Sequence, residues 1–352
     1  MKKGMLSIII PYFCGEKYIE KTIDSILESK YKNFEIVIID DGSPENKGVI
    51  CDKLLERDNR VKVFHKSNSG IADTRNYGIE VSEGEFIAFV DQDDKVPDDM
   101  YSCLIQMLLM NECDMVVSNF KCHEEITEKM YDNQIIKFER VIEADKLNNL
   151  RKWLVMGEVL EEPEIIIPST VWNCVFRADI VRNNNVKFES FIQYDDDWVF
   201  LLRYLSVCKK VYLTDKSYYC WHIHSSSESH TPRYLDNIEQ RYENLKRFKL
   251  TYMSDCKVSV KEKERFDKYF YANFVYIVIT NESIVVKDLA SMAKSLRYIY
   301  QLCKLDRWGK MKLSDIGDVT NLLIMKKGKK AGMIYTLAKR KMYLAALLIS
   351  KI

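Results

Sequence analysis

The sequence has few of the features that mark loop-rich, disulfide-bonded or membrane-spanning proteins. Its 352 residues include only 12 glycines and 6 prolines, which favours a helix-rich architecture over a loop-rich one. The ten cysteines form no CxxC pair and no zinc-binding spacing, so we interpret them as reduced, buried thiols. The sequence contains no apolar run of about 18 residues, the length that a membrane-spanning helix needs. We therefore expect a cytoplasmic protein.

The chain also lacks an excess of charge of either sign, with 53 basic residues against 52 acidic ones. No overall field would attract nucleic acid, so we expect no nucleic-acid partner. GxGxxG and GxxxxGK[ST] motifs are absent, which argues against dinucleotides and P-loop triphosphates as ligands. The first residues combine basic charge with a short apolar run but lack a small-residue cleavage site, so we expect no signal peptide.

Short apolar runs alternate with amphipathic segments over the first 120 residues. The runs at residues 6–10, 35–39, 61–64, 86–90 and 115–118 predict strands, and the segments at residues 16–27, 46–56, 71–81 and 100–110 predict helices. Regular strand–helix alternation with short loops predicts a doubly wound, mostly parallel α/β sheet.

The pattern changes after residue 120. Residues 121–167 show no strong period and are interpreted as an insertion, residues 170–177 as a strand, and residues 191–205 as an acidic cluster that opens a helix. Helices are predicted at residues 235–252, 261–279 and 290–303. We therefore divide the chain into a first half of an α/β domain at residues 1–120, a second half at 121–230, and a helical region at 231–352.

Three carboxylates, Asp91, Asp93 and Asp94, follow the apolar run at residues 86–90. A buried strand that ends in acids presents them at the carboxyl edge of the sheet, where ligands bind in open α/β sheets. Such crowded acids repel one another unless solvent or a cation neutralises them. Their oxygens suit Mg²⁺ or Mn²⁺ with coordination positions left for phosphate. An isolated Asp-x-Asp is more often a solvated acidic turn, so the flanking sequence must decide.

Two other features could act with these acids. Asp40 and Asp41 end the second predicted strand, where a carboxylate could accept the imide N–H of uracil; the same residues also suit a turn and a helix cap. Arg75 could direct its guanidinium at phosphates or could be an exposed helical arginine.

A second acidic cluster occupies residues 195–197. One of these carboxylates could remove a proton from an incoming hydroxyl, because burial and neighbouring acids raise a carboxyl pKa towards a useful value. Acids at a helix start also cap the helix and interact with its dipole, and two of the three could do only that.

Six segments, taken in order, resemble family 2 of the inverting nucleotide-sugar glycosyltransferases, of the type that builds bacterial surface polysaccharides. They are SIIIPYFCGEKYIEKTIDSIL, NFEIVIIDDGS, VKVFHKSNSGIADTRNYGI, SEGEFIAFVDQDD, YDDDWVF and the aromatic stretch that ends in HIHSSSES. The resemblance implies a GT-A fold, which is Rossmann-like with a doubly wound, mostly parallel sheet, here with a helical C-terminal extension.

The resemblance also implies roles on the nucleotide side. Pro11 and Phe13 would form the wall against the base. Asp41 would bind uracil, with Asp40 supporting that turn. Arg75 would approach the base or the diphosphate.

Metal and acceptor roles follow from the same resemblance. Asp93 would be a metal ligand, Asp91 would hold the ribose or the metal, and His224 would contact metal or phosphate. Asp197 matches the catalytic base, with Trp198 following it on the acceptor side. A histidine in a polar surface loop is the alternative interpretation of His224.

Three residues depart from the family pattern. Cys14 stands where asparagine is usual, so a hydrogen bond to the base is expected to be missing. Asp196, on the acceptor side, replaces a glutamate and is one methylene shorter. His222 replaces a common arginine, which predicts pH-dependent phosphate binding. The chain also lacks QxxRW, which argues against processive polymer export.

These observations predict a metal-dependent inverting glycosyltransferase, hexosyl- or N-acetylhexosaminyl-, that moves one sugar from a UDP-sugar to a hydroxyl. The expected acceptor is a surface or capsular polysaccharide intermediate, lipid-linked or free, and the expected cofactor is Mn²⁺ or Mg²⁺. Two alternatives stay open: a sugar-phosphate nucleotidyltransferase, and a non-catalytic nucleotide-binding subunit. The first would need a cation-bearing glycine-rich loop after the first strand, and no cation occurs there before Lys17.

The last part of the chain is basic and amphipathic. After Asp318 there is no acidic residue, whereas eight lysines and arginines follow, interleaved with apolar residues at 322–324 and 343–349. Such a tail can lie on an anionic membrane surface. It can equally be a terminal helix that packs on its own domain, and the sequence does not choose between them.

Overall fold

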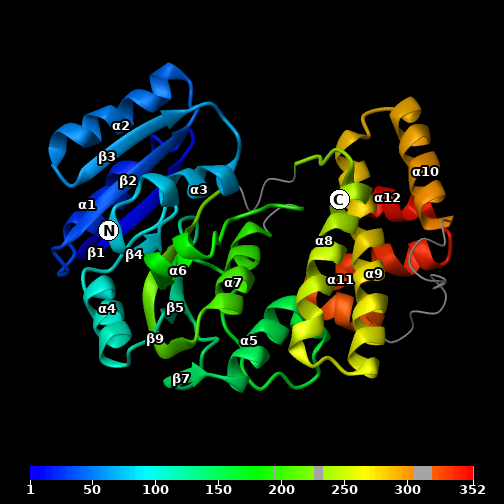
Figure 1. Cartoon of the computed structure of the whole chain (residues 1–352). Coiled ribbons are helices and arrows are strands. Elements are labelled where there is room, and N and C mark those ends of the chain that lie inside the picture. Colours follow the sequence, from blue (N-terminus) through cyan, green and yellow to red (C-terminus); the bar gives the residue numbers. More distant parts are fainter. Residues whose placement is uncertain (193–194, 226–232, 305–318, 352) are drawn as a thin grey trace. The chain divides into compact units, whose positions relative to one another are not determined.

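The chain divides into two compact units. The computed structural model describes residues 1–192, 195–225, 233–304 and 319–351, without the side chains of residues 45, 158, 304 and 319–326 (Figure 1). Unit 1 comprises Met1–Leu154 and Glu164–Ser225, and unit 2 comprises Val155–Pro163 and Ser226–Ile352.

Strands and helices alternate along the first part of the chain. The strands are β1 (Lys2–Tyr12), β2 (Phe34–Asp41), β3 (Val61–Lys66), β4 (Gly84–Phe89), β5 (Met115–Glu124), β6 (Lys129–Asn133), β7 (Arg140–Glu143), β8 (Cys174–Arg177) and β9 (Lys210–Ile223). The helices are α1 (Ile19–Leu27), α2 (Glu45–Arg57), α3 (Ile71–Val81), α4 (Met100–Met110), α5 (Asp145–Met156), η1 (Gly157–Val159), α6 (Ala178–Asn183) and α7 (Asp196–Val207).

One sheet unites these strands in the order β3-β2-β1-β4-β8-β5-β9-β7, with β6 paired to β5. The neighbours among β1 to β4 are parallel, β8 is antiparallel to both β4 and β5, and β9 is parallel to β5. The carboxyl ends of β1, β2, β4 and β9 therefore lie at the same edge. The predicted doubly wound, mostly parallel sheet is confirmed.

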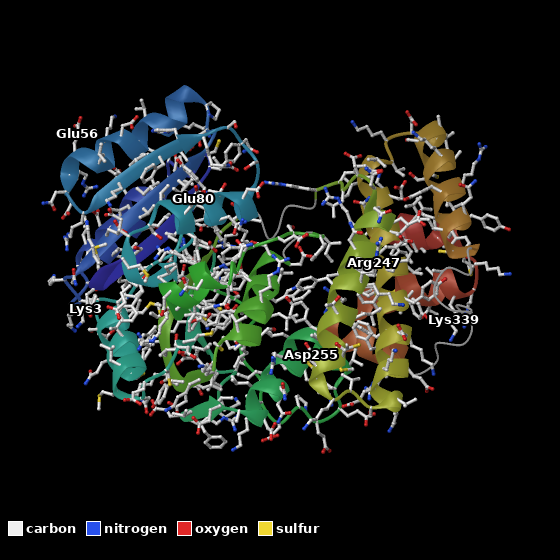
Figure 2. All side chains as sticks on the ribbon, viewed as in Figure 1. Lys3, Glu56, Glu80, Arg247, Asp255 and Lys339 are labelled. Atoms are coloured by element: carbon white, nitrogen blue, oxygen red, sulfur yellow. The ribbon has the colours of Figure 1, made fainter. Side chains whose placement is uncertain are left out.

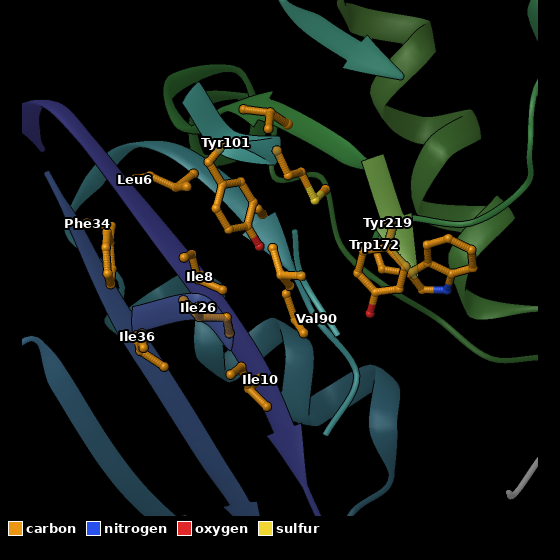
Figure 3. Close-up of a cluster of buried hydrophobic side chains, with 14 of the residues drawn as sticks. Leu6, Ile8, Ile10, Ile26, Phe34, Ile36, Val90, Tyr101, Trp172 and Tyr219 are labelled. Atoms are coloured by element: carbon orange, nitrogen blue, oxygen red, sulfur yellow. The ribbon is translucent and has the colours of Figure 1, made fainter. Parts of the chain in front are cut away.

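The two faces of the sheet are covered by different helices, because successive strand residues point to opposite faces. Leu6, Ile8 and Ile10 of β1 are buried in one apolar cluster with residues of α1, α2 and α4 (Figure 3). Ile9 points to the other face, where a Cβ added to Gly78 of α3 would lie 2.3 Å from its Cγ2. Helix α3 thus approaches β1 at a place that only glycine permits.

Several segment boundaries differ from the sequence predictions. The strand predicted at residues 6–10 extends over Lys2–Tyr12, and the strand predicted at 170–177 is only Cys174–Arg177. Residues 121–167, interpreted as an insertion without strong pattern, contain β6, β7 and α5. Strand β6 is mostly exposed and has no apolar alternation, so periodicity could not find it.

Unit 2 is helical, as predicted for the C-terminal region. Its helices after residue 232 are α8 (Ile238–Met253), η3 (Ser254–Cys256), α9 (Val260–Val285), α10 (Leu289–Lys304), α11 (Val319–Lys339), which is kinked at Gly328, and α12 (Tyr343–Lys351). Helix α9 packs against α8, α10, α11 and α12, and a capping box formed by Ser259 and Glu262 begins it.

Within the described residues, no helix is both long enough and apolar enough to cross a bilayer. Charged side chains such as Glu56 on α2, Glu80 on α3 and Arg247 on α8 are exposed (Figure 2). Residues 226–229 of the histidine-rich segment, and the side chains of the apolar residues at 322–324 and of Lys326, lie outside the described part of the chain.

Candidate active site

The acidic turn lies at the carboxyl end of β4, where the sequence places it. Asp91, Asp93 and Asp94 follow the strand, and the Asp94 N–H donates to the Asp91 carbonyl at 3.2 Å to close the turn. The carboxyl groups of Asp91 and Asp93 are 30% and 23% exposed, whereas Asp94 is buried. Asp91 and Asp93 are therefore the two acids of the turn that a ligand could reach.

Asp94 links the acidic turn to strand β9. Its Oδ2 accepts from the Tyr219 hydroxyl at 2.6 Å and its Oδ1 accepts from the His222 N–H at 2.7 Å. The Tyr219 hydroxyl also accepts from the Asp91 N–H at 3.2 Å. Burial, with Asp93 and Asp91 nearby, raises the pKa of Asp94 well above its ordinary value. Asp94 and Tyr219 together fix the ends of β4 and β9 to each other.

His224, just after β9, contacts the acidic turn. Its Nε2 lies 2.7 Å from Asp93 Oδ2. Tyr18 stacks on the imidazole with ring centroids 4.2 Å apart, and the Tyr18 hydroxyl donates to Glu125. Burial lowers the pKa of the neighbouring His222, with Glu125 opposing the shift. The structure thus brings the predicted pair Asp93 and His224 together.

Arg75 of α3 lies among three carboxylates and is only 3% exposed. Its Nη2 donates to Asp91 Oδ1 at 2.8 Å, and its Nη1 donates to Asp196 Oδ2 at 2.7 Å and to Asp197 Oδ1 at 2.5 Å. Its guanidinium carbon lies 5.3 Å from the ring centroid of Phe188. Arg75 therefore joins the acidic turn after β4 to the acidic start of α7.

The three acids at the start of α7 have different environments. Asp195 accepts from the Phe191 N–H, the Ile192 N–H and the Ser190 hydroxyl, so it organises the preceding loop. Burial raises the pKa of Asp195 to about 6. Asp196 and Asp197 instead point to Arg75, and Trp198 follows them half-buried.

Asp197 combines burial with an open side. Its Oδ2 accepts from the Val171 N–H at 3.2 Å, and its side chain is 17% exposed. Burial raises the pKa of Asp197 to about 7, with Arg75 opposing the shift and Asp196 and Asp91 adding to it. A carboxyl group with this pKa can accept a proton near neutral pH, which is the property required of a general base.

The predicted uracil-binding acids at the end of β2 organise two loops. Asp40 accepts from the Ser43 N–H at 3.0 Å and lies 2.8 Å from His65 Nδ1. Asp41 forms an ion pair with Lys66 and accepts from the backbone N–H groups of Ser69 and Gly70, just before α3. Both carboxylates are buried, and their bonds tie the loops after β2 and before α3 to the edge of the sheet.

The predicted base wall is divided between a buried and an exposed residue. Pro11 is buried within β1, whereas Phe13, just after the strand, is 40% exposed. Cys14 has a φ of 51°, and its N–H donates to the Ser43 hydroxyl at 3.0 Å. Asparagine adopts the left-handed region more readily than most residues. Cysteine at this position therefore departs from a local backbone preference as well as from the family pattern.

Sequence reasoning did not assign four residues that hold the site together. Gln92 lies between Asp91 and Asp93, and its side chain forms two hydrogen bonds with the backbone of Phe13. Its Oε1 accepts from the Phe13 N–H at 2.9 Å, and its Nε2 donates to the Phe13 carbonyl at 3.1 Å. Tyr18, Phe188 and Tyr219 support His224, Arg75 and Asp94 respectively. Their contacts join segments distant in sequence; the one available signal was the density of aromatic residues in YYCWHIH.

The family model described as Glycosyl transferase family 2 matches residues 7–159, a segment that holds Arg75 and the whole acidic turn. By this match, the chain carries a family 2 glycosyltransferase domain within residues 7–159. The chain is 29% identical to Glycosyltransferase GlyG of Streptococcus pneumoniae over 215 residues, which cover 61% of this chain and 69% of the relative. It is 24% identical to Uncharacterized glycosyltransferase EpsJ of Bacillus subtilis over 295 residues, which cover 84% of this chain and 83% of the relative.

A solved structure, that of S. aureus TarS in complex with UDP-GlcNAc, resembles this chain with a TM-score of 0.59 at 16% identity. The match covers 98% of this chain and 90% of the TarS chain. At 16% identity the likeness is one of fold alone. It confirms the predicted GT-A fold with a helical C-terminal region. Among the described residues no group of three or more His, Cys, Asp or Glu side chains is arranged to hold a metal ion, and the metal stays a prediction.

Proposed function

We propose that this glycosyltransferase moves one sugar from a UDP-sugar to a hydroxyl acceptor with inversion at the anomeric carbon. The observation that carries the proposal is the meeting of two acidic clusters through Arg75, one at a ligand-binding strand end and one at the start of α7. A donor that binds at the first cluster would face a base in the second.

In this mechanism Asp197 is the base. Its carboxylate takes the proton of the acceptor hydroxyl while the acceptor oxygen attacks the anomeric carbon and UDP leaves from the opposite face. Its pKa of about 7 and its partial exposure suit that task. Asp196 and Trp198 are proposed to border the acceptor, and Phe13, Pro11, Asp40 and Asp41 to shape the pocket for the base.

The proposed ion is Mn²⁺ or Mg²⁺. Asp93 would offer a hard oxygen beside the imidazole of His224, a mixed set that Mn²⁺ accepts. Asp91, whose carboxyl group is 30% exposed and bonded to Arg75, is the third proposed ligand. When bound, such an ion stabilises negative charge that develops on the leaving diphosphate. The protein's part is to hold Asp93 and His224 in place through Asp94 and Tyr18.

The donor class is supported by the fold shared with TarS, which was solved with UDP-GlcNAc and with UDP. The proposed acceptor is a surface or capsular polysaccharide intermediate that is carried on a lipid. The proposal is tested by a panel of UDP-sugars scored for UDP release with Mn²⁺ and a mixture of glycan acceptors. We expect UDP to be released from one donor sugar, and only when an acceptor is present. Release of pyrophosphate instead of UDP would contradict the proposed function.

We also propose that the basic C-terminal helices contact an anionic membrane surface on the inner face of the cell membrane. Lys329 and Lys330 of α11 are exposed near Met333, and α12 exposes Leu344 and Leu348 on one face. Cosedimentation with vesicles that contain anionic lipid, but not with zwitterionic vesicles, is the expected result. Equal recovery with both vesicle types would contradict the electrostatic part of this proposal.

A further inference from the structure

The hydrogen-bond partners of Arg75 are carboxylates of the protein itself, which points to a role other than contact with the donor. Of its guanidinium nitrogens, Nη2 is directed to the end of β4 and Nη1 to the start of α7. The side chain is 3% exposed, so it is a fixed internal element and not a free surface cation.

The surroundings hold the guanidinium in one place. Phe188 lies against it, and the Phe188 ring stacks on Phe200 of α7 at 4.1 Å. Asn76, next to Arg75 on α3, bonds both backbone groups of Phe188: it donates to the carbonyl at 3.0 Å and accepts from the N–H at 2.8 Å. Helix α3 therefore fixes both the arginine and the aromatic ring under it.

We propose that Arg75 is a positioning residue for the base and holds the Asp197 carboxylate towards the acceptor side. The inference rests on the proposed function, in which Asp197 is that base. Arg75 bonds Asp197 Oδ1, and the Val171 N–H donates to Oδ2. Oδ2, the oxygen outside the ion pair, is therefore the one proposed to take the hydroxyl proton.

The charges that face Asp197 determine the sign of the test. Arg75 faces it from α3, Asp91 from the end of β4, the Cys174 thiol from β8, and Asp196 from the same helix. Removing the positive charge leaves Asp197 among acids and raises its pKa, whereas removing the charge of Asp196 lowers it.

The experiment measures the pH dependence of kcat at saturating donor for the wild type, Arg75→Lys, Arg75→Gln and Asp196→Asn. Arg75→Gln should move the acidic limb to higher pH by about 1–3 units, the range for an opposite charge at this distance. Arg75→Lys should move the acidic limb less, because lysine keeps the positive charge but lacks the two Nη groups with which arginine bonds several carboxylates at once. Asp196→Asn should move the limb to lower pH.

The matched control is Arg60→Gln, which breaks an ion pair with Asp58 at the amino end of β3, away from the acidic edge. Its profile should coincide with that of the wild type. A loss in Arg75→Gln that is confined to donor affinity, with an unshifted limb, would overturn the proposal and assign Arg75 to the donor.

A measurement that needs no turnover separates this inference from the proposed function. The infrared difference between the wild type and Asp197→Asn, titrated with pH, reports the ionisation of Asp197 directly. The same difference in an Asp196→Asn background should shift to lower pH, and this holds if the Arg75 variants do not fold. An Asp197 titration that stays unchanged in an Arg75→Lys or Arg75→Gln background would overturn the contact proposed between Arg75 and Asp197. Absent UDP release with a shifted titration would overturn the proposed function and leave only that contact.

Discussion

At the scale of single residues, Asp197 carries the sharpest prediction. Asp197→Asn keeps the shape and volume of the side chain but cannot accept the acceptor proton. We expect transfer to fall by about 10²–10⁴-fold, the usual contribution of a positioned base, while UDP affinity stays near that of the wild type. Turnover is measured by UDP release and affinity by calorimetric titration. Normal turnover in this variant would remove Asp197 from the role.

The same residue predicts opposite effects of pH on activity and on stability. Because the base must be ionised, kcat should rise as the pH passes through about 7. The folded state raises the pKa of Asp197 above its ordinary value of 3.8, so between these two values the folded protein binds more protons than the unfolded chain. Its contribution to stability therefore decreases as the pH rises through that window.

We accordingly expect Asp197→Asn to have a higher Tm than the wild type at pH 8 and a smaller difference at pH 5. Thermal unfolding at the two pH values measures this. A variant that is less stable at both would show that the ion pair with Arg75 outweighs the burial of the acid.

The position of a residue at the end of a strand could be predicted from the local sequence pattern. The contacts between residues distant in sequence could not. A strand followed by Asp-x-Asp placed Asp91 and Asp93 at the sheet edge. The bonds from Arg75 to Asp196 and Asp197 cross more than 120 positions of sequence, and no local pattern encodes them. From the sequence, Arg75 was therefore expected to contact the donor, whereas in the structure it bonds Asp91, Asp196 and Asp197.

At the scale of elements, the close pairing of β1 and β4 is the vulnerable feature. Gly84 begins β4, its N–H donates to the Ser7 hydroxyl, and a Cβ there would lie 2.7 Å from the Met5 carbonyl oxygen. Gly84→Ala must push the strands apart, so we expect a loss of about 1–3 kcal/mol in the free energy of unfolding. Chemical denaturation measures it, with the exposed Val49→Ala on α2 as the control. Equal stabilities of the two variants would contradict the close packing.

Elements were predictable where an apolar run is buried on both faces, as in β1, β2 and β4. They were missed where a strand is exposed or short, as in β6 and β7, because side-chain periodicity arises only from a buried face. The start of α1 was placed three residues early, since Glu16 and Lys17 continue the helical pattern while the backbone there forms a turn. Neither error moves the acidic edge.

At the scale of the whole molecule, two compact units with their own buried cores predict two unfolding transitions. Unit 1 holds the proposed nucleotide site, so UDP with Mn²⁺ should raise the transition temperature of unit 1 and leave that of unit 2 unchanged. At a hundredfold excess over Kd the expected stabilisation is about 2.7 kcal/mol. Phe270→Ala, in the core of α9, should lower the other transition. A single transition that shifts as a whole in both experiments would contradict independent units.

We propose above all that the acids after β4 and the imidazole of His224 hold a divalent ion and the diphosphate of a nucleotide. The most direct test of this proposal is a calorimetric titration of UDP into the wild type and Asp93→Asn, each with Mn²⁺ and with a chelator. Mn²⁺ is expected to tighten UDP binding at least tenfold in the wild type and to have little effect in Asp93→Asn. Equal UDP affinity in all four titrations, or no binding in any, would contradict it.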